Sequence, residues 1–317
     1  MDTSVIINQM LILFVMIIMG FILNKAHVLG KTQDSIITKI IIYFSMPCMV
    51  LNAVLSQSGP KEYKQVGIFI ILALIMYIIL PIIAFFVVRI PVVPKNLRGI
   101  YQFMIIFGNV GFMGFPLVSA VFGPESVLYA GIFNIAFNLL SYSYGVYIVS
   151  NDDPDNSGAK TDFKLSFKKF LSPGISVSLI ALILYFTGIE FPEFIKSPVA
   201  SFGNMTTPMA MLVIGSTLAN MKIKEVFTDW RAYLFVAFRN ILLPIVLIPV
   251  MKLTIKDPFS FSFTLIMLLV PIANSSVLYS KEYGSDENFA AKCVIISTLL
   301  SIVTIPSISM LADLIKI

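Results

Sequence analysis

The stretch FMIIFGNVGFMGFPLVSAVFGPE at residues 103–125 breaks a hydrophobic run in its middle with glycines, an asparagine and a proline. A second stretch, TLIMLLVPIANSSVLYSKEYGSDE at residues 264–287, is broken in the same way. The two keep a fixed step of 161, which carries Leu117, Ser119, Phe122 and Gly123 onto Leu278, Ser280, Tyr283 and Gly284. A pair of broken membrane helices at matching positions in two halves of a chain indicates the binding site of a secondary transporter. We therefore predict that the chain moves a small solute across a membrane.

The composition also indicates a membrane protein. Of the 317 residues, 58% are hydrophobic and 12% are charged, and the mean hydropathy is +0.93. The first apolar run, residues 5–23, lacks a basic leader and a small-residue cleavage site, so we interpret it as a retained span rather than a signal peptide. Cys48 and Cys293 lie inside apolar runs, which predicts neither a disulfide scaffold nor a zinc site. The net charge of +5 forms no basic stripe, so no nucleic-acid partner is predicted.

The apolar runs predict an all-α polytopic membrane protein with ten transmembrane helices. Their approximate ranges are 5–23, 34–55, 65–88, 100–121, 125–148, 171–188, 197–219, 230–251, 259–280 and 287–311. A polar stretch divides the chain into a first repeat at 1–149, a loop at 150–170 and a second repeat at 171–317. Five spans per half place the two repeats in opposite orientations, so we predict two inverted five-helix repeats. The step of 161 also carries Pro47 onto Pro208.

The basic residues predict the orientation in the cell membrane. Loops after the odd-numbered spans hold about twice as many lysines and arginines as the loops on the opposite side. Because basic loops stay in the cytoplasm, we expect both termini outside and the 150–170 loop in the cytoplasm.

The residues that break the two helices are candidates for the substrate site. Asn109 and Asn274 each lie near the middle of a span at 1.5 Å per residue. The residues that interrupt the helical backbone around them are Gly108, Gly111, Gly114, Pro116 and Pro271. Unwound backbone at this depth either lines a wet cavity or is buried in protein, and half-helix N-termini suit an anionic group. The alternative is that the prolines are structural and that each asparagine only joins helices.

These motifs resemble those of the auxin efflux carrier family, which includes the plant PIN proteins and bacterial malate permease-like carriers. The pattern Asn109-x4-Gly114-x-Pro116-Leu117, followed by Gly123, resembles the family's fourth-helix motif. Pro271 and the run 281–283 (KEY) resemble its ninth-helix motif, and Pro306 has a counterpart in the last span.

The resemblance implies a fold in which helices 4 and 9 cross, as in PIN-like and bile acid symporter-like carriers. It implies a scaffold domain of spans 1, 2, 6 and 7, a transport domain of spans 3–5 and 8–10, elevator-type alternating access, and a homodimer through the scaffold. The central loop is shorter than in the long plant carriers, and Ser276 stands where those often have a second proline. A generic small organic anion is therefore expected rather than auxin itself.

Other polar residues inside the spans have more than one interpretation. Arg239 lies about 13 Å along its span from Trp230, and it either contacts substrate, bonds the freed carbonyls of a broken helix, or snorkels to the surface. Asn138 shares a helical face with Asn134 and either lines the cavity or packs against the fourth span.

The coupling ion cannot be read from the sequence, because no Asp or Glu lies at the centre of a span. Sodium has candidate ligands in Ser275, Ser276 and Asn138, and a proton could use Asp34 or a substrate carboxyl group.

The predicted function is a secondary carrier for a small carboxylate such as a malate-like or auxin-like anion, surrounded by lipid and without a cofactor. An enzyme is disfavoured, because the chain has one histidine and no catalytic cluster inside its spans. A channel fits matched broken helices poorly. A ligand sensor without transport, or a sodium-coupled symporter of a larger amphipathic anion, remains the alternative.

Overall fold

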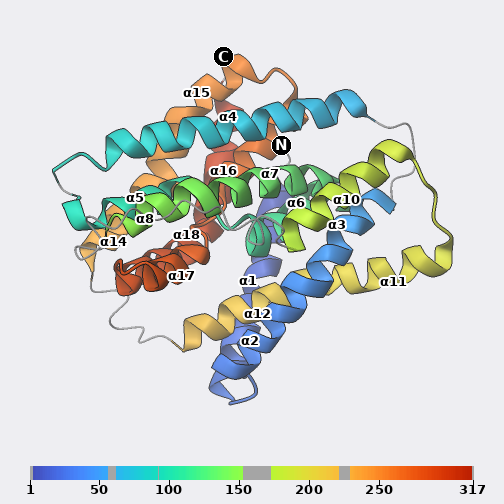
Figure 1. Cartoon of the computed structure of the whole chain (residues 1–317), viewed down its shortest axis with the longest axis horizontal. Coiled ribbons are helices and arrows are strands. Elements are labelled where there is room, and N and C mark those ends of the chain that lie inside the picture. The colour runs from blue at the N-terminus through green and yellow to red at the C-terminus, as the bar shows by residue number, and fades with distance from the viewer. Residues whose placement is uncertain (1–2, 56–61, 92, 153–172, 221–228, 316–317) are drawn as a thin grey trace.

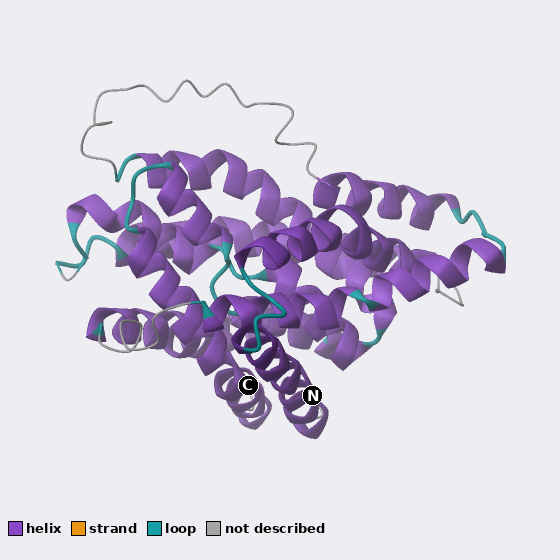
Figure 2. Cartoon of the chain, turned by 90° about the horizontal axis from the view of Figure 1, so that it is seen from below, coloured by secondary structure: helices purple, strands orange, loops and turns teal. Residues whose placement is uncertain are grey.

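The described chain is built from α-helices that pack in antiparallel and crossing layers (Figures 1 and 2). A computed structural model describes residues 3–55, 62–91, 93–152, 173–220 and 229–315. The helices are α1 (Thr3–Lys25), α2 (Lys31–Ile40), α3 (Met46–Leu55), α4 (Tyr63–Val87), α5 (Arg98–Ile106), α6 (Phe115–Phe122), α7 (Val127–Leu140), α8 (Val146–Ser150), α10 (Pro173–Thr187), α11 (Glu193–Asn204), α12 (Thr206–Ala219), α14 (Trp230–Ala237), α15 (Leu243–Thr254), α16 (Pro258–Leu269), α17 (Ser275–Glu282) and α18 (Glu287–Leu314). Within these ranges no strand occurs beyond one isolated bridge between Gly108 and Ile272.

Six helical segments are long and apolar enough to cross a membrane: 4–25, 31–55, 63–87, 124–150, 230–254 and 287–314. Shorter apolar helices cover 110–122, 173–187 and 258–269. The predicted fourth and ninth spans fall in this shorter class because each is divided into two half-helices, α5 with α6 and α16 with α17. These helices confirm a multi-pass helical membrane protein. Most of the predicted loop at 150–170 lies outside the described residues.

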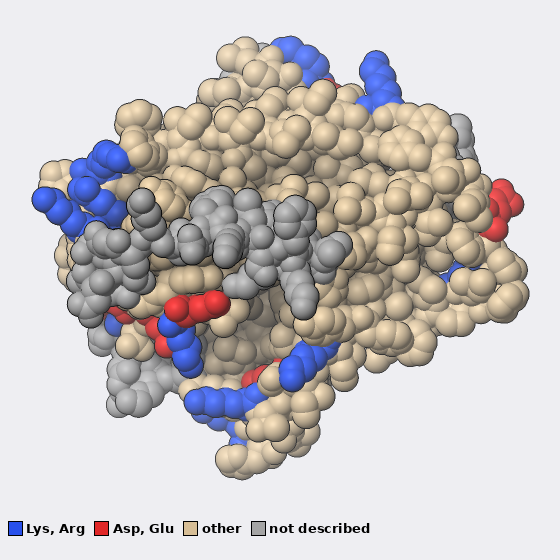
Figure 3. All heavy atoms as spheres, in the orientation of Figure 1, with Lys and Arg blue, Asp and Glu red and all other residues tan. Residues whose placement is uncertain are grey.

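Charged side chains on the face shown in Figure 3 lie mostly toward its edges, and a broad area between them is uncharged. Large apolar side chains such as Ile78 and Phe86 on α4 are more than half exposed. A surface of this kind is expected where helices contact lipid hydrocarbon, since apolar side chains are not excluded from a hydrocarbon solvent.

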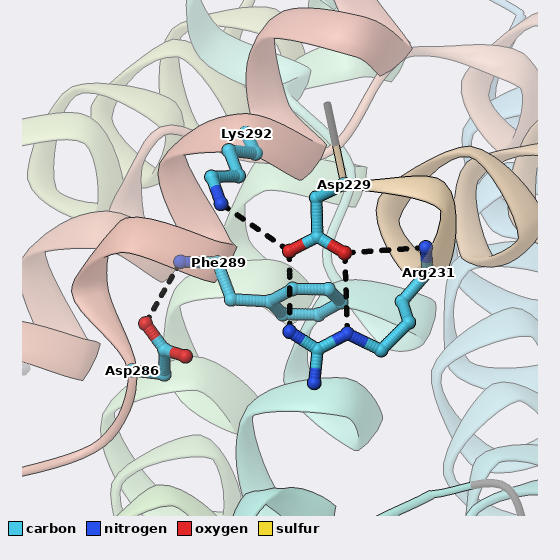
Figure 4. Close-up of polar contacts among 5 residues, drawn as sticks. All are labelled: Asp229, Arg231, Asp286, Phe289 and Lys292. Carbon is cyan, nitrogen blue, oxygen red and sulfur yellow. Dashed lines mark hydrogen bonds and ion pairs between the residues drawn. The ribbon is translucent and has the colours of Figure 1, made fainter. Parts of the chain in front are cut away.

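An ion-pair cluster joins α14 to α18 (Figure 4). The Asp229 carboxylate accepts hydrogen bonds from Arg231 Nε at 3.1 Å and from Lys292 Nζ at 3.2 Å. The Arg231 guanidinium lies 6.0 Å from the ring centre of Phe289, and Asp286 caps α18 by accepting from Phe289 N at 2.9 Å. The hydrogen bond from Arg231 lowers the pKa of Asp229. The cluster therefore holds the start of α14 against α18.

A buried carboxylate caps the start of α5. Asp152, which is 4% exposed, accepts hydrogen bonds from Gly99 N and Ile100 N, both at 2.7 Å, and from Ser285 Oγ at 2.9 Å. These bonds satisfy two free N–H groups of the first turn of α5 and connect this turn to the segment before α18. Burial raises the pKa of Asp152 from 3.8 to about 6, and the three hydrogen bonds only partly oppose that effect.

The raised pKa of Asp152 predicts a pH-dependent stability. The folded state binds this proton more tightly than the unfolded chain, so the carboxyl group contributes stability that is fully present below pH 3.8 and is lost as the pH rises through about 6. The size is on the order of 3 kcal/mol. We expect the Asp152→Asn variant, measured by thermal unfolding in detergent, to lose less stability than the parent between pH 4 and pH 7. Equal slopes for the two proteins would contradict the assignment.

Candidate functional site

The two broken helices meet at their unwound segments, which pair through their backbones. Asn109 N donates a hydrogen bond to Pro271 O at 2.7 Å, and Ala273 N donates to Phe107 O at 3.1 Å. Gly108 and Ile272 form an antiparallel bridge between these two bonds. The pairing gives partners to buried backbone groups that no helix satisfies at this point. Segments more than 160 residues apart therefore form one structural unit.

The local sequence explains why each helix ends where it does. Pro271 has no N–H to donate to the preceding turn, so α16 stops at Leu269. On the other helix, Asn109 Oδ1 accepts a hydrogen bond from Phe112 N at 3.1 Å and caps the segment that follows. Gly108 permits the close approach, because a Cβ atom there would lie 2.7 Å from Val270 Cγ2. Gly114 needs no such explanation, since its nearest contact would be an ordinary 3.6 Å.

A cavity of about 330 Å³ opens beside the paired segments. Its lining residues are Ile42, Tyr43, Met46, Gly108, Asn109, Val110, Gly111, Phe112, Asn134, Phe137, Asn138, Tyr142, Pro173, Gly174, Ala273, Asn274 and Ser275. We call it the crossover cavity. It brings together four of the six predicted substrate-binding residues, Asn109, Asn138, Asn274 and Ser275. It does not include Arg239 or Ser276.

The crossover cavity has hydrogen-bond donors at one end and no charge. None of the described residues that line it is acidic or basic. The N-terminus of α17 begins at Ser275, and the segment Val110–Gly114 begins beside Asn109, so two helical N-termini open onto the cavity. Each carries a partial positive charge of about half a unit. The Ser275 hydroxyl is buried and has no hydrogen-bond partner within the described structure. This end of the cavity therefore suits a small anionic group.

Asn138 and Asn134 form a linked pair on one wall of the crossover cavity. Asn138 Nδ2 donates to Asn134 O at 2.7 Å and to Asn134 Oδ1 at 3.1 Å. Asn138 thus both lines the cavity and bonds within its own helix, α7. Asn134 was considered from the sequence only as a neighbour of Asn138 on the helical face, and the i, i+4 spacing was the signal that could have included it in the site.

Arg239 lies outside the cavity, behind the unwound segments. Its side chain is 1% exposed, and Nη1 donates to Leu268 O at 3.0 Å, in the last turn of α16. Nη2 lies 3.4 Å from the point where a Cβ atom of Gly108 would be. This burial excludes snorkelling in the structure. Of the three interpretations made from the sequence, the contacts favour bonding of the freed carbonyls of a broken helix.

Ser276 also lies outside the cavity. It is fully buried, and its hydroxyl donates to Ala273 O at 2.6 Å, one turn back along the chain. A serine in the first turn of a short helix bonds the local backbone readily, which removes it from contact with a ligand. Pro116, Gly114 and Pro271 likewise shape the backbone without lining the cavity.

The sequence reasoning did not anticipate four π-helical segments that surround the site: Ile41–Ser45, Val110–Gly114, Ser141–Gly145 and Phe238–Leu242. The first three contribute lining residues, including Tyr43, Phe112 and Tyr142, and the fourth carries Arg239. Single π-helical turns inside α-helices occur frequently at functional sites. No residue pattern marks such a turn, so it was not predictable from hydrophobic periodicity.

Comparison with known proteins agrees with this architecture. The sequence model of the family described as membrane transport protein matches residues 5–309. An uncharacterized transporter of Methanothermobacter thermautotrophicus is 20% identical over 300 residues, covering 94% of this chain and 96% of its own. Another uncharacterized transporter, from Methanocaldococcus jannaschii, is 21% identical over 305 residues, with the same coverage. The predicted resemblance is confirmed, and the relatives indicate a transporter rather than an enzyme. The chain belongs to the membrane transport protein family, which includes the auxin efflux carriers.

Proposed function

We propose that this protein is a secondary carrier for a small organic anion and that the crossover cavity is its substrate site. The observation that supports this most is the pairing of two unwound segments beside an uncharged cavity onto which two helical N-termini open. Broken helices of this kind place partial positive charges toward anionic substrate groups near the middle of a membrane. The asparagine and serine side chains at that end add neutral hydrogen-bond donors.

The lining of the cavity favours a monocarboxylate with an apolar body over a malate-like dicarboxylate. Donors gather at the end formed by Asn109, Asn274 and Ser275, whereas the remaining wall carries aromatic and aliphatic side chains, among them Phe112 and Phe137. A second carboxylate would face this apolar wall without a cation, which is costly in a desolvated site. The volume of about 330 Å³ is at the lower end of the range for small-molecule sites.

The proposed transport cycle has the elevator form, with two inverted five-helix repeats, a scaffold domain and a mobile transport domain. The matched positions of the two breaks support the inverted repeat. Both termini outside, a cytoplasmic central loop, a homodimer through the scaffold, and coupling to a proton or to sodium also belong to this proposal. They rest on the distribution of basic residues and on the family.

Uptake of labelled carboxylates into proteoliposomes tests the proposed site. We expect Asn109→Ala and Asn274→Ala each to weaken substrate binding about 10- to 100-fold, since a hydrogen bond to a charged group contributes roughly 1.5–3 kcal/mol. Asn96→Ala is a matched control, because Asn96 is exposed in the turn before α5 and should leave uptake unchanged. Malate, lactate and indole acetate, each with and without sodium and a pH gradient, distinguish the substrate classes and the coupling ion.

Unchanged substrate affinity in both cavity variants would show that the site lies elsewhere. Substrate-dependent thermal stabilisation without uptake or counterflow would instead support the ligand-sensor alternative. Sodium-dependent uptake of a larger amphipathic anion, with no uptake of small carboxylates, would support the symporter alternative.

A further inference from the structure

A second polar cluster lies at the opposite end of the scaffold helices, where α1, α2 and α12 meet (Figure 1). Asp34 of α2 accepts hydrogen bonds through Oδ2 from Ser216 Oγ at 2.8 Å and from Asn220 Nδ2 at 3.3 Å. Asn24 of α1 donates through Nδ2 to Ser216 Oγ at 2.9 Å and to Asn220 Oδ1 at 3.1 Å. None of these four residues lines the crossover cavity. The cluster is therefore separate from the proposed substrate site.

The charge of Asp34 is not balanced by a neighbouring cation. The residue is 8% exposed, its Oδ1 atom is buried without a hydrogen-bond partner, and no ion pair joins it to a basic side chain of the described chain. The nearest basic residue in this cluster, Lys25, directs its Nζ to Ala219 O at 3.1 Å and to the Phe21 ring. His27 and Lys31, in and after the following turn, are exposed. A buried carboxylate with a free oxygen is costly unless something binds it.

The groups around the free oxygen match the preference of a hard cation. The cluster offers oxygens from one carboxylate, two carboxamides and one hydroxyl, and hard cations take oxygen ligands. It also lies at the C-termini of α1 and α12, which end at Lys25 and Ala219 and carry partial negative charge. Helix C-termini together with side-chain oxygens coordinate sodium in other membrane carriers. A single carboxylate suits one positive charge better than two.

We propose that Asp34, Asn24, Ser216 and Asn220 form a binding site for a monovalent metal cation of the sodium type. The backbone around the site is rigid, because α1 and α12 approach closely at two glycines. A Cβ atom on Gly215 would lie 1.9 Å from Ile17 O, and one on Gly20 would lie 2.3 Å from Leu212 O. The oxygen ligands are thus held in place before the ion binds. The bound ion joins the ends of α1, α2 and α12.

The cation dependence of thermal stability tests this site. The full-length protein in lipid nanodiscs is heated in chloride salts of sodium, lithium, potassium or N-methyl-D-glucamine at pH 7.5 and constant ionic strength. We expect the melting temperature to rise with sodium concentration relative to N-methyl-D-glucamine, because an ion that binds only the folded state stabilises it. Asp34→Asn should remove the rise. Glu287→Gln, which neutralises an exposed carboxylate, is the matched control and should retain it.

A second variant protects the test against a misfolded Asp34→Asn protein. Asn24→Leu removes one amide oxygen and keeps the carboxylate, so it should raise the sodium concentration for half-maximal stabilisation by roughly tenfold, the equivalent of one weakened ligand. Equal melting temperatures in all four salts would overturn the proposal, as would a sodium effect that persists in Asp34→Asn. A melting temperature that responds to pH but to no metal cation would also overturn it and would assign a proton instead. None of these outcomes depends on substrate transport.

Discussion

Gly215→Ala is expected to destabilise the protein by about 3 kcal/mol, at the upper end of the cost of overpacking. The added methyl group would lie 1.9 Å from Ile17 O and 2.8 Å from Phe21 N, both backbone atoms of α1. No rotation of a side chain can relieve a clash with backbone, so α1 and α12 would have to separate. Thermal unfolding in detergent should show a melting temperature lower by roughly 5–10 °C.

Gly67→Ala is the matched control for this prediction. Gly67 lies inside α4, and a Cβ atom there would meet nothing within 4 Å. Alanine is favoured over glycine in a helix by about 1 kcal/mol, so this variant should be as stable as the parent or slightly more stable. If both variants unfolded at the parent temperature, the close approach of α1 and α12 would be disproved.

Arg239→Met is expected to reduce uptake by about 100-fold, the equivalent of the roughly 3 kcal/mol lost when one partner of a buried charged contact is removed. The guanidinium donates to Leu268 O at the end of α16 and lies beside Gly108, which follows the end of α5. Each of these helix ends carries about half a negative charge. Without the cation, the two ends would face each other unneutralised in a desolvated interior, and the pairing of the unwound segments would weaken.

Two further variants separate this role from a general effect of charge. Arg239→Lys should not restore uptake, because an ammonium group lacks the planar set of donors that reaches two backbone segments at once. Arg231→Met removes an arginine whose side chain is 47% exposed and whose ion pair with Asp229 is at the surface, so uptake should change little. Uptake by Arg239→Met within twofold of the parent, with unchanged circular dichroism, would contradict the assignment.

The positions of the helix breaks were predictable because their causes are local. Pro271 lacks a donor, and Asn109 bonds the backbone three residues ahead, so each interrupts a helix wherever the rest of the chain lies. The same local chemistry identified Asn274 and Ser275, which begin the next helix and line the cavity. The membrane class followed from composition in the same way.

The roles of Arg239, Ser276 and Asn134 were not predictable, because each depends on which side of its helix meets a distant segment. Hydrophobic periodicity gives the depth of Arg239 in its span, and only packing decides that it faces Leu268 O rather than the cavity. Ser276 and Ser275 are neighbours in sequence, yet one is fully buried and the other lines the cavity, since successive residues of a helix point about 100° apart.

By itself the sequence determined that this is a helical membrane protein of one carrier family, with two matched breaks, because composition, proline and glycine act over a few residues. Only the tertiary structure decided that the N–H of Asn109 bonds Pro271 O, that α1 and α12 touch through Gly20 and Gly215, and that Asp34 is buried with an unpaired oxygen. Those contacts join segments far apart in the chain, and their formation depends on how whole helices pack rather than on the preferences of any one segment.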